Sequence, residues 1–178
     1  MHNQFPRTIE TKYGEKINFL RMEGDRLILE GFCKPMAGPG MHVHLRQDEC
    51  VTVIHGKIGY QILGEAPQYA GPGDSVLFKR GVPHRFWNAG EEELRISGWI
   101  DPAENVAFFL SALYDALNRG RDNRPELFDG AYLTCRYRRE FDAPEIPRFV
   151  KNVVMPIVYG IGRLLGKYRK FDQAPQPF

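Results

Sequence analysis

The chain has 178 residues, 43% of them hydrophobic, and its 24 Lys and Arg residues against 22 Asp and Glu residues leave a formal net charge of +2. A chain of this size can bury the core of one globular domain without disulfides, and so balanced a charge gives no reason to expect a nucleic-acid partner. Its three cysteines form no CxxC pair, and no stretch reaches the roughly 18 apolar residues of a membrane helix, so a cytoplasmic protein is expected.

The N-terminal part of the chain, residues 1–100, has the pattern of short β-strands. Residues 1–10 hold no apolar run, so no signal peptide is expected. Beyond them, runs rich in Val, Ile, Leu, Phe and Tyr alternate with glycine- and proline-containing turns. The runs predict strands at residues 16–21, 26–34, 50–55, 57–63, 75–78, 84–87 and 94–100. Many short strands without a helical period between them predict an all-β barrel or sandwich.

From Asp101 onward the apolar period becomes helical, which predicts a helical extension over residues 101–178, packed on the barrel or on a partner subunit. Asp101 as N-cap, Pro102 at the first helical position and Glu104 in the first turn predict a helix start. The helix should end at Gly120. Its apolar stripe is expected to consist of Val106, Phe109, Leu110, Leu113 and Leu117.

Further helices are expected toward the C-terminus. A second helix is predicted over residues 125–139 and a linker over residues 141–147. A third should occupy residues 149–171, interrupted or restarted at Pro156, and the tail beyond Asp172 should be loose.

The third predicted helix is basic and amphipathic. Arg163, Lys167 and Lys170 share one face, and an apolar stripe on another face consists of Ile157, Ile161, Leu164, Leu165 and Tyr168. Such a helix can pack on the barrel or on a second subunit, or it can lie on an anionic membrane surface. We favour packing, because burial is the ordinary fate of an apolar stripe.

Three of the five histidines fall into two short blocks that suit one metal ion. His42 and His44 alternate along an extended segment, so both rings can point to the same face. Glu49 lies an odd number of residues after His44, so the intervening residues must turn the chain and return Glu49 on a neighbouring strand. His84 follows a Gly-x-Pro turn in the second block. Imidazole and carboxylate ligands of this kind suit first-row divalent metals rather than calcium.

The alternative is that these are ordinary histidines with satisfied hydrogen bonds. A lone His-x-His pair would carry little weight, but here the pair comes together with Glu49, His84 and the glycines around them. We therefore predict His42, His44, Glu49 and His84 as metal ligands. The remaining two histidines, His2 and His55, are expected to be bystanders.

Both blocks resemble known motifs. Gly40-Met41-His42-Val43-His44 through Glu49, with Gly56 beyond, is similar to the first cupin motif, and Gly73-Asp74 through Gly81-Val82-Pro83-His84, with Asn88 beyond, is similar to the second. The chain is thereby identified as a member of the cupin superfamily, of the single-domain type with a conserved barrel over about residues 15 to 100. Two positions depart from the motifs, Met36 in place of a glycine and Lys79 in place of a proline.

The resemblance implies a mainly β fold, a cupin jelly-roll β-barrel, with a metal inside and a tendency to form homodimers. The ion would be Fe, Mn, Ni, Zn or Cu, and open coordination positions would receive a small-molecule ligand. The protein would then be a metal-dependent oxygenase or isomerase, with Glu49 as catalytic base. Two alternatives remain open: a non-catalytic small-molecule binding protein, and a peripheral membrane or oligomerisation module built on the basic helix.

Several neighbouring residues are candidates for supporting roles. Gln47, Asp48 and Asn88 can accept the second ring N–H of a ligand histidine. Arg46 is expected to be a solvated surface residue, with contact to an anionic substrate as the alternative. Cys50 should face away from Glu49 and is not expected to be a catalytic thiol. For Phe86, Trp99 and Tyr60, simple core packing is favoured for each taken singly; the alternative is a place on the pocket wall, for which Phe86 is the better candidate.

Overall fold

A computed structural model of the protein describes residues 5–178; His2 lies outside the described residues. The strands before the first helix are β1 (Arg7–Glu10), β2 (Glu15–Glu23), β3 (Arg26–Cys33), β4 (Val43–His44), β5 (Asp48–His55), β6 (Ile58–Ile62), β7 (Gln68–Ala70), β8 (Ser75–Phe78), β9 (His84–Asn88) and β10 (Leu94–Asp101). They are followed by α1 (Val106–Arg119), α2 (Leu127–Arg136), β11 (Phe141–Asp142), a π-helical turn (Val150–Val154), α3 (Met155–Leu164) and a 3-10 turn (Arg169–Phe171). The mainly β fold with a helical C-terminal part is as predicted.

The strands form a barrel whose sheets are antiparallel throughout the described residues. One sheet has the order β1-β2-β3-β10-β5-β8 and a second the order β7-β6-β9, while β4 pairs with β11. Buried and half-buried residues alternate along β3 and β5, so one face of each strand points into the barrel. The barrel core consists of Cys33, Val51, Val53, Ile58, Val76, Phe78, Phe86, Leu94 and Ile96.

All seven predicted strands are present, with ends that differ by at most two residues. Strands β1, β4, β7 and β11 were not predicted from the sequence. They have two to four residues each and lack an apolar alternation. Their pairing depends on partners that lie elsewhere in the chain.

The predicted start of the first helix is wrong. Asp101 is the last residue of β10, where it pairs with Asp48 of β5, and its carboxylate accepts from Arg26 at 3.1 Å. Glu104 has a φ of +42° and pairs with Arg46, so helical backbone begins only at Val106. Strand pairing and two ion pairs therefore outweigh the local capping signal.

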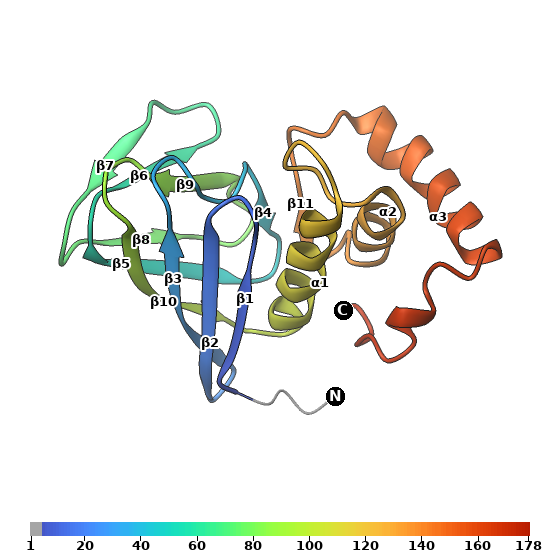
Figure 1. The fold of residues 1–178 in the computed structure, drawn as a ribbon, viewed down its shortest axis with the longest axis horizontal. Helices are drawn as coiled ribbons and strands as arrows, with labels where there is room; N and C mark the ends of the chain where they lie inside the picture. Colours follow the sequence, from blue (N-terminus) through green and yellow to red (C-terminus); the bar gives the residue numbers. More distant parts are fainter. Residues whose placement is uncertain (1–4) are drawn as a thin grey trace.

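The helices lie beside the barrel on one side (Figure 1). A second core joins them to it: Phe19, Leu27 and Leu29 of the sheet lie in the same cluster as Val106 of α1 and Tyr137, which is fully buried. The apolar faces of α1 and α2 are thus buried against the open end of the sheet.

The C-terminal tail is ordered by hydrogen bonds, so the expectation of a loose tail is wrong. The Tyr137 hydroxyl donates to the carbonyl of Pro175 at 2.8 Å, and Asn105 donates to the carbonyl of Gln176 at 3.0 Å. The backbone N–H of Phe178 donates to Glu140 at 3.1 Å. Buried polar groups of the helical part supply these contacts, and the tail sequence does not reveal them.

None of the helices described here, over residues 5–178, has both the length and the apolar character needed to cross a membrane.

Candidate metal centre

Three strands and the residue before one of them bring the predicted ligands to one place. His44 lies on β4, Glu49 on β5 and His84 on β9, and His42 immediately precedes β4. The backbones of His42 and His84 exchange hydrogen bonds of 2.9 and 2.8 Å, which joins the two sequence blocks directly. Gly81, with a φ of +78°, makes the turn before His84 and donates to the carbonyl of His44 at 2.8 Å. This φ favours glycine, and the turn fixes the register of β9.

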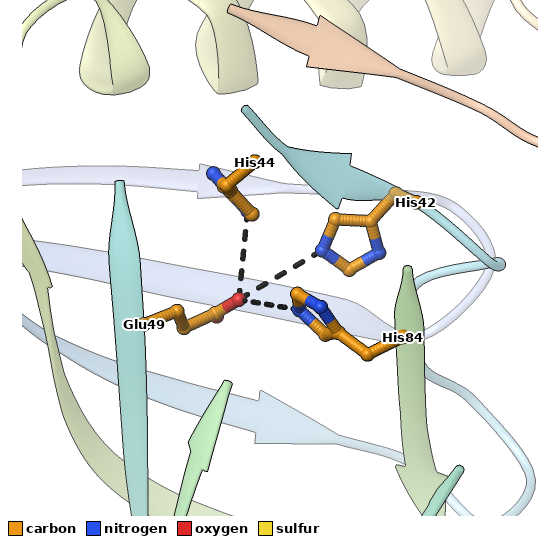
Figure 2. Close-up of side chains that lie close together, drawn as sticks. All are labelled: His42, His44, Glu49 and His84. Atoms are coloured by element: carbon orange, nitrogen blue, oxygen red, sulfur yellow. Dashed lines mark hydrogen bonds and ion pairs between the residues drawn. The ribbon is translucent and has the colours of Figure 1, made fainter. Parts of the chain in front are cut away.

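The four side chains point toward one another (Figure 2). The Oε2 atom of Glu49 lies 3.1 Å from Nε2 of His84, 3.5 Å from Nε2 of His44 and 3.8 Å from Nε2 of His42. One ligand atom from each residue lies within 4.8 Å of the others. A single ion can therefore reach all four after small side-chain adjustments.

The electrostatics favour the metal-binding forms of Glu49 and His44. Burial by itself raises the pKa of Glu49, but hydrogen bonds from His42 and His84 and the charge of the histidines bring that pKa well below its ordinary value. Burial lowers the pKa of His44 to about 3. Burial also opposes the charged form of His42, but its hydrogen bond with Glu49 raises its pKa overall. Glu49 is thus ionised and His44 neutral, as metal coordination requires.

Backbone carbonyls orient two of the histidines. Nδ1 of His42 lies 2.8 Å from the carbonyl of Gly40, and Nδ1 of His84 lies 2.8 Å from the carbonyl of Val82. In the neutral tautomer with an N–H at Nδ1, the lone pair lies on Nε2, where it could bind an ion. In the protonated ring, which the raised pKa of His42 favours, Nε2 instead donates to Glu49. The buried Nδ1 of His44 has no hydrogen-bond partner among residues 5–178. The donor set fits a first-row divalent metal.

The side chains predicted to orient the histidines do something else. Asp48 binds Lys79 and Arg80, and Gln47 donates to Glu104 at 2.9 Å. Asn88 donates to the carbonyls of Cys33 and Glu92 and so closes the loop after β9. The sequence could not distinguish these roles, because carbonyl acceptors carry no sequence signal.

Arg46 and Cys50 have no direct part in the site. The guanidinium of Arg46 makes a two-pronged contact with Glu104, and it lies 5.1 Å from the ring of Phe178. Its side chain is 43% exposed, as predicted for a surface arginine, and it does not line the cavity. Burial raises the pKa of the Cys50 thiol, in agreement with the prediction that it is not a reactive thiolate.

One departure from the motifs coincides with an unusual backbone conformation. Met36 stands where a glycine was expected, and its φ is +65°. A residue with a side chain is strained in this region, which explains why glycine is the ordinary choice there. Lys79, at the expected proline, pairs with Asp48 at 2.9 Å.

A cavity of about 370 Å³ adjoins the cluster. His42, His44 and Glu49 lie on its wall together with Phe86, which also packs in the barrel core, whereas His84 does not line it and is only 1% exposed. Trp99 and Tyr60 do not line this cavity. The opposite wall is formed by α1 through Phe109, Leu110, Leu113 and Leu117. The predicted apolar stripe of the first helix thus covers the site; of the five stripe residues only Val106 is fully buried in the core.

A buried acid on the same wall was not predicted. Glu15 is 7% exposed, and its carboxylate accepts from the hydroxyl of Tyr114 at 3.1 Å; both residues line the cavity. Strand alternation could have revealed it: Glu15 lies two and four residues before Ile17 and Phe19, so all three side chains point to the same inner face of β2. Tyr114 comes from α1, so the pairing itself depends on the tertiary fold.

We expect Glu15 to lower the stability of the protein at neutral pH. Burial raises its pKa, with the Tyr114 hydrogen bond as a smaller opposing effect. A carboxyl whose pKa is higher in the folded than in the unfolded state favours folding at low pH and loses this advantage as pH rises through the folded pKa. The E15Q variant should therefore gain stability relative to the native chain between pH 4 and pH 8, as measured by urea unfolding. A constant difference across that range would contradict the assignment.

Comparison with known proteins agrees with the fold. Residues 33–100 match the family model described as Cupin domain. A curated relative, Oxidoreductase iacF of Pestalotiopsis fici (strain W106-1 / CGMCC3.15140), is 32% identical over 72 residues. The match covers 39% of this chain and 35% of the relative, so it spans about a third of that protein.

Solved structures with the same kind of barrel are also similar. An uncharacterized conserved protein with a double-stranded beta-helix domain from Klebsiella pneumoniae subsp. pneumoniae MGH 78578 has a TM-score of 0.48 and 20% identity, over 52% of this chain and 81% of that one. KdgF from Halomonas sp. has a TM-score of 0.47 and 18% identity, over 53% of this chain and 86% of that one. The fold is a cupin jelly-roll barrel with three α-helices after it within residues 5–178.

Proposed function

We propose that this protein is a metal-dependent cupin that acts on a small, largely apolar organic molecule. His42, His44, Glu49 and His84 would hold one divalent transition metal, with Fe, Mn, Ni, Zn and Cu as the candidates. The observation that carries the proposal is the convergence of four ligand atoms within 4.8 Å, beside a 370 Å³ cavity whose wall includes His42, His44 and Glu49. Four protein ligands leave positions open on a six-coordinate ion, and the cavity would supply the molecule that fills them.

The residues of this chain have separate roles in this proposal. The metal would polarise an oxygen-containing group of the substrate. Glu49 is the one acidic ligand, so its carboxylate can take a proton from the substrate if it leaves the ion. The aromatic and aliphatic side chains of the cavity wall, including Phe86 and the α1 stripe, would exclude water and bind the apolar part of the substrate.

The pair of Glu15 and Tyr114 would bind a second polar group of the substrate. Both side chains lie on the wall of the cavity that also holds the histidines. A hydroxyl or carbonyl group in this position would share the hydrogen bond that now joins the two residues. The preferred substrate would then carry oxygen at two separated positions, as in phenols with more than one hydroxyl group.

We infer an oxygenase or an isomerase, and the relative named as an oxidoreductase supports an oxidative reaction. In this proposal residues 1–100 form the catalytic barrel, and residues 101–178 cover its cavity. A binding protein without turnover is the second candidate, because the same cavity and metal would also hold a ligand that is carried or sensed.

The test measures oxygen uptake and product formation on panels of phenols, keto acids and sugars, with protein loaded in turn with Fe(II), Mn(II) and Ni(II). We expect turnover of at least one phenol, lost in H42A and retained in H55A, whose histidine is exposed and pairs with Glu92. Tight binding of a panel compound without turnover would favour the binding protein. A well-folded chain that binds none of the metals would exclude both.

A further inference from the structure

The helix α3 has an apolar face that points away from the rest of the molecule. In Figure 1 it runs along the outer edge of the helical part, on the far side of α2 from the barrel. We call this the outer face of α3; it consists of Phe149, Val153, Ile157, Ile161, Leu164 and Leu165. The first four repeat every four residues, and all six are exposed, Leu164 to 89% and Phe149 to 67%.

This exposure contradicts packing of the stripe on the barrel, one of the two arrangements expected, while packing on a second subunit stays a prediction. Of the predicted stripe only Tyr168 is buried, and it packs on Gly162 and on the rings of Tyr132 and Tyr159. The contacts with α2 therefore use the opposite side of α3, through Tyr159 and Gly162. The outer face is left without a partner among residues 5–178.

The charges beside this face are all positive. No acidic residue occurs between residues 146 and 171. Lys151 pairs with Asp142, and Lys170 with Asp129. The exposed basic residues without a salt-bridge partner in the described part of the chain are Arg148, Arg163, Lys167 and Arg169.

We propose that the outer face of α3 docks on an anionic membrane surface. Six exposed apolar side chains with flanking basic residues are what an interfacial helix presents to acyl chains and acidic headgroups. The π-helical turn and α3 together have 15 residues, or about 22 Å, so the helix would lie in the plane of the interface.

A second copy of the chain fits this face less well. A two-fold contact places the same surface on both sides, so Arg148, Arg163 and Lys167 would meet basic residues of the other copy. The face contributes no acidic residue that could compensate them. An anionic lipid surface satisfies both the apolar side chains and the charges.

The test is co-sedimentation of the full chain with vesicles of phosphatidylcholine containing phosphatidylserine, compared with phosphatidylcholine alone. We expect binding to the anionic vesicles at about 0.1 M salt that falls sharply at about 1 M salt, because the Debye length decreases from about 10 Å to about 3 Å. The double variant R163E/K167E should bind more than about tenfold more weakly. The double variant L164Q/L165Q should lose binding as well.

Matched controls are available on the barrel. The variants R7E/K34E and L63Q/L77Q change exposed basic and apolar residues far from α3, and they should bind vesicles like the native chain. Equal binding to neutral vesicles, or no difference between the α3 and barrel variants, would overturn the proposal. The proposal would also be overturned if light scattering showed a stable dimer that became monomeric in L164Q/L165Q, and if the protein never bound vesicles. The proposal is independent of the metal, so loss of metal binding leaves it unaffected.

Discussion

The H84A variant should fold but bind divalent metal more than about 100-fold more weakly than the native chain. Changes beside metal ligands already lower affinity by about 10–100-fold, and His84 is itself in the ligand group. The three remaining ligand atoms would no longer enclose the ion, and the carboxylate of Glu49 would lose its 3.1 Å contact. Metal content by elemental analysis and affinity by competition with a chelating dye measure the effect.

The matched control for this variant is H55A. His55 is also a histidine of the barrel, but its side chain is 59% exposed and pairs only with Glu92 at 2.9 Å. Its loss should leave metal content unchanged. If H84A and H55A bind metal equally well, the four side chains are not the metal site and the proposed chemistry fails with them.

The F141A variant should lower the free energy of unfolding by about 3 kcal/mol, the scale for removing a buried phenylalanine. Phe141 is 9% exposed and stacks on Phe109 with ring centroids 4.0 Å apart. It also lies edge-on to His44 at 5.5 Å, so its loss should weaken metal affinity roughly tenfold by loosening that ring. Urea unfolding with and without metal separates the two effects.

Phe149 supplies the control, because it lies eight residues further on and is 67% exposed. F149A should change stability by no more than about 0.5 kcal/mol and leave metal affinity as it is. A destabilised F141A with unchanged metal affinity would show that the helical part covers the site without supporting it.

The convergence of the four side chains could be predicted from the sequence because each lies in a short motif with its own turn. His42 and His44 share a face by strand alternation, and His84 follows the Gly81 turn, so local rules fix the direction of each side chain. Most strands were predictable for a similar reason: their apolar alternation is a property of the strand itself. Predicting these strands did not require knowing which other strands they pair with.

The remaining features depend on contacts between distant parts of the chain. Glu15 is a candidate substrate-binding residue only because α1 brings Tyr114 to it, and the exposed Arg46 binds Glu104 and Phe178, which lie far from it in the sequence. The helix start was misplaced because Asp101 continues a strand whose partner is β5. In each case the local signal was correct but weaker than a tertiary contact.

The short β11 strand has a consequence for any attempt to shorten this protein. Its residues Phe141 and Asp142 are the strand partners of His44 and Val43, and the N–H of Leu45 donates to the carbonyl of Glu140 at 2.8 Å. A fragment that stops after β10 would leave the backbone amide and carbonyl groups of β4, the strand that carries His44, without their hydrogen-bond partners. It would also expose the cavity beside the histidines to water. An unpaired strand of this kind invites strand-to-strand aggregation. The minimal working unit of this protein should therefore extend well past the segment that the cupin motifs delimit.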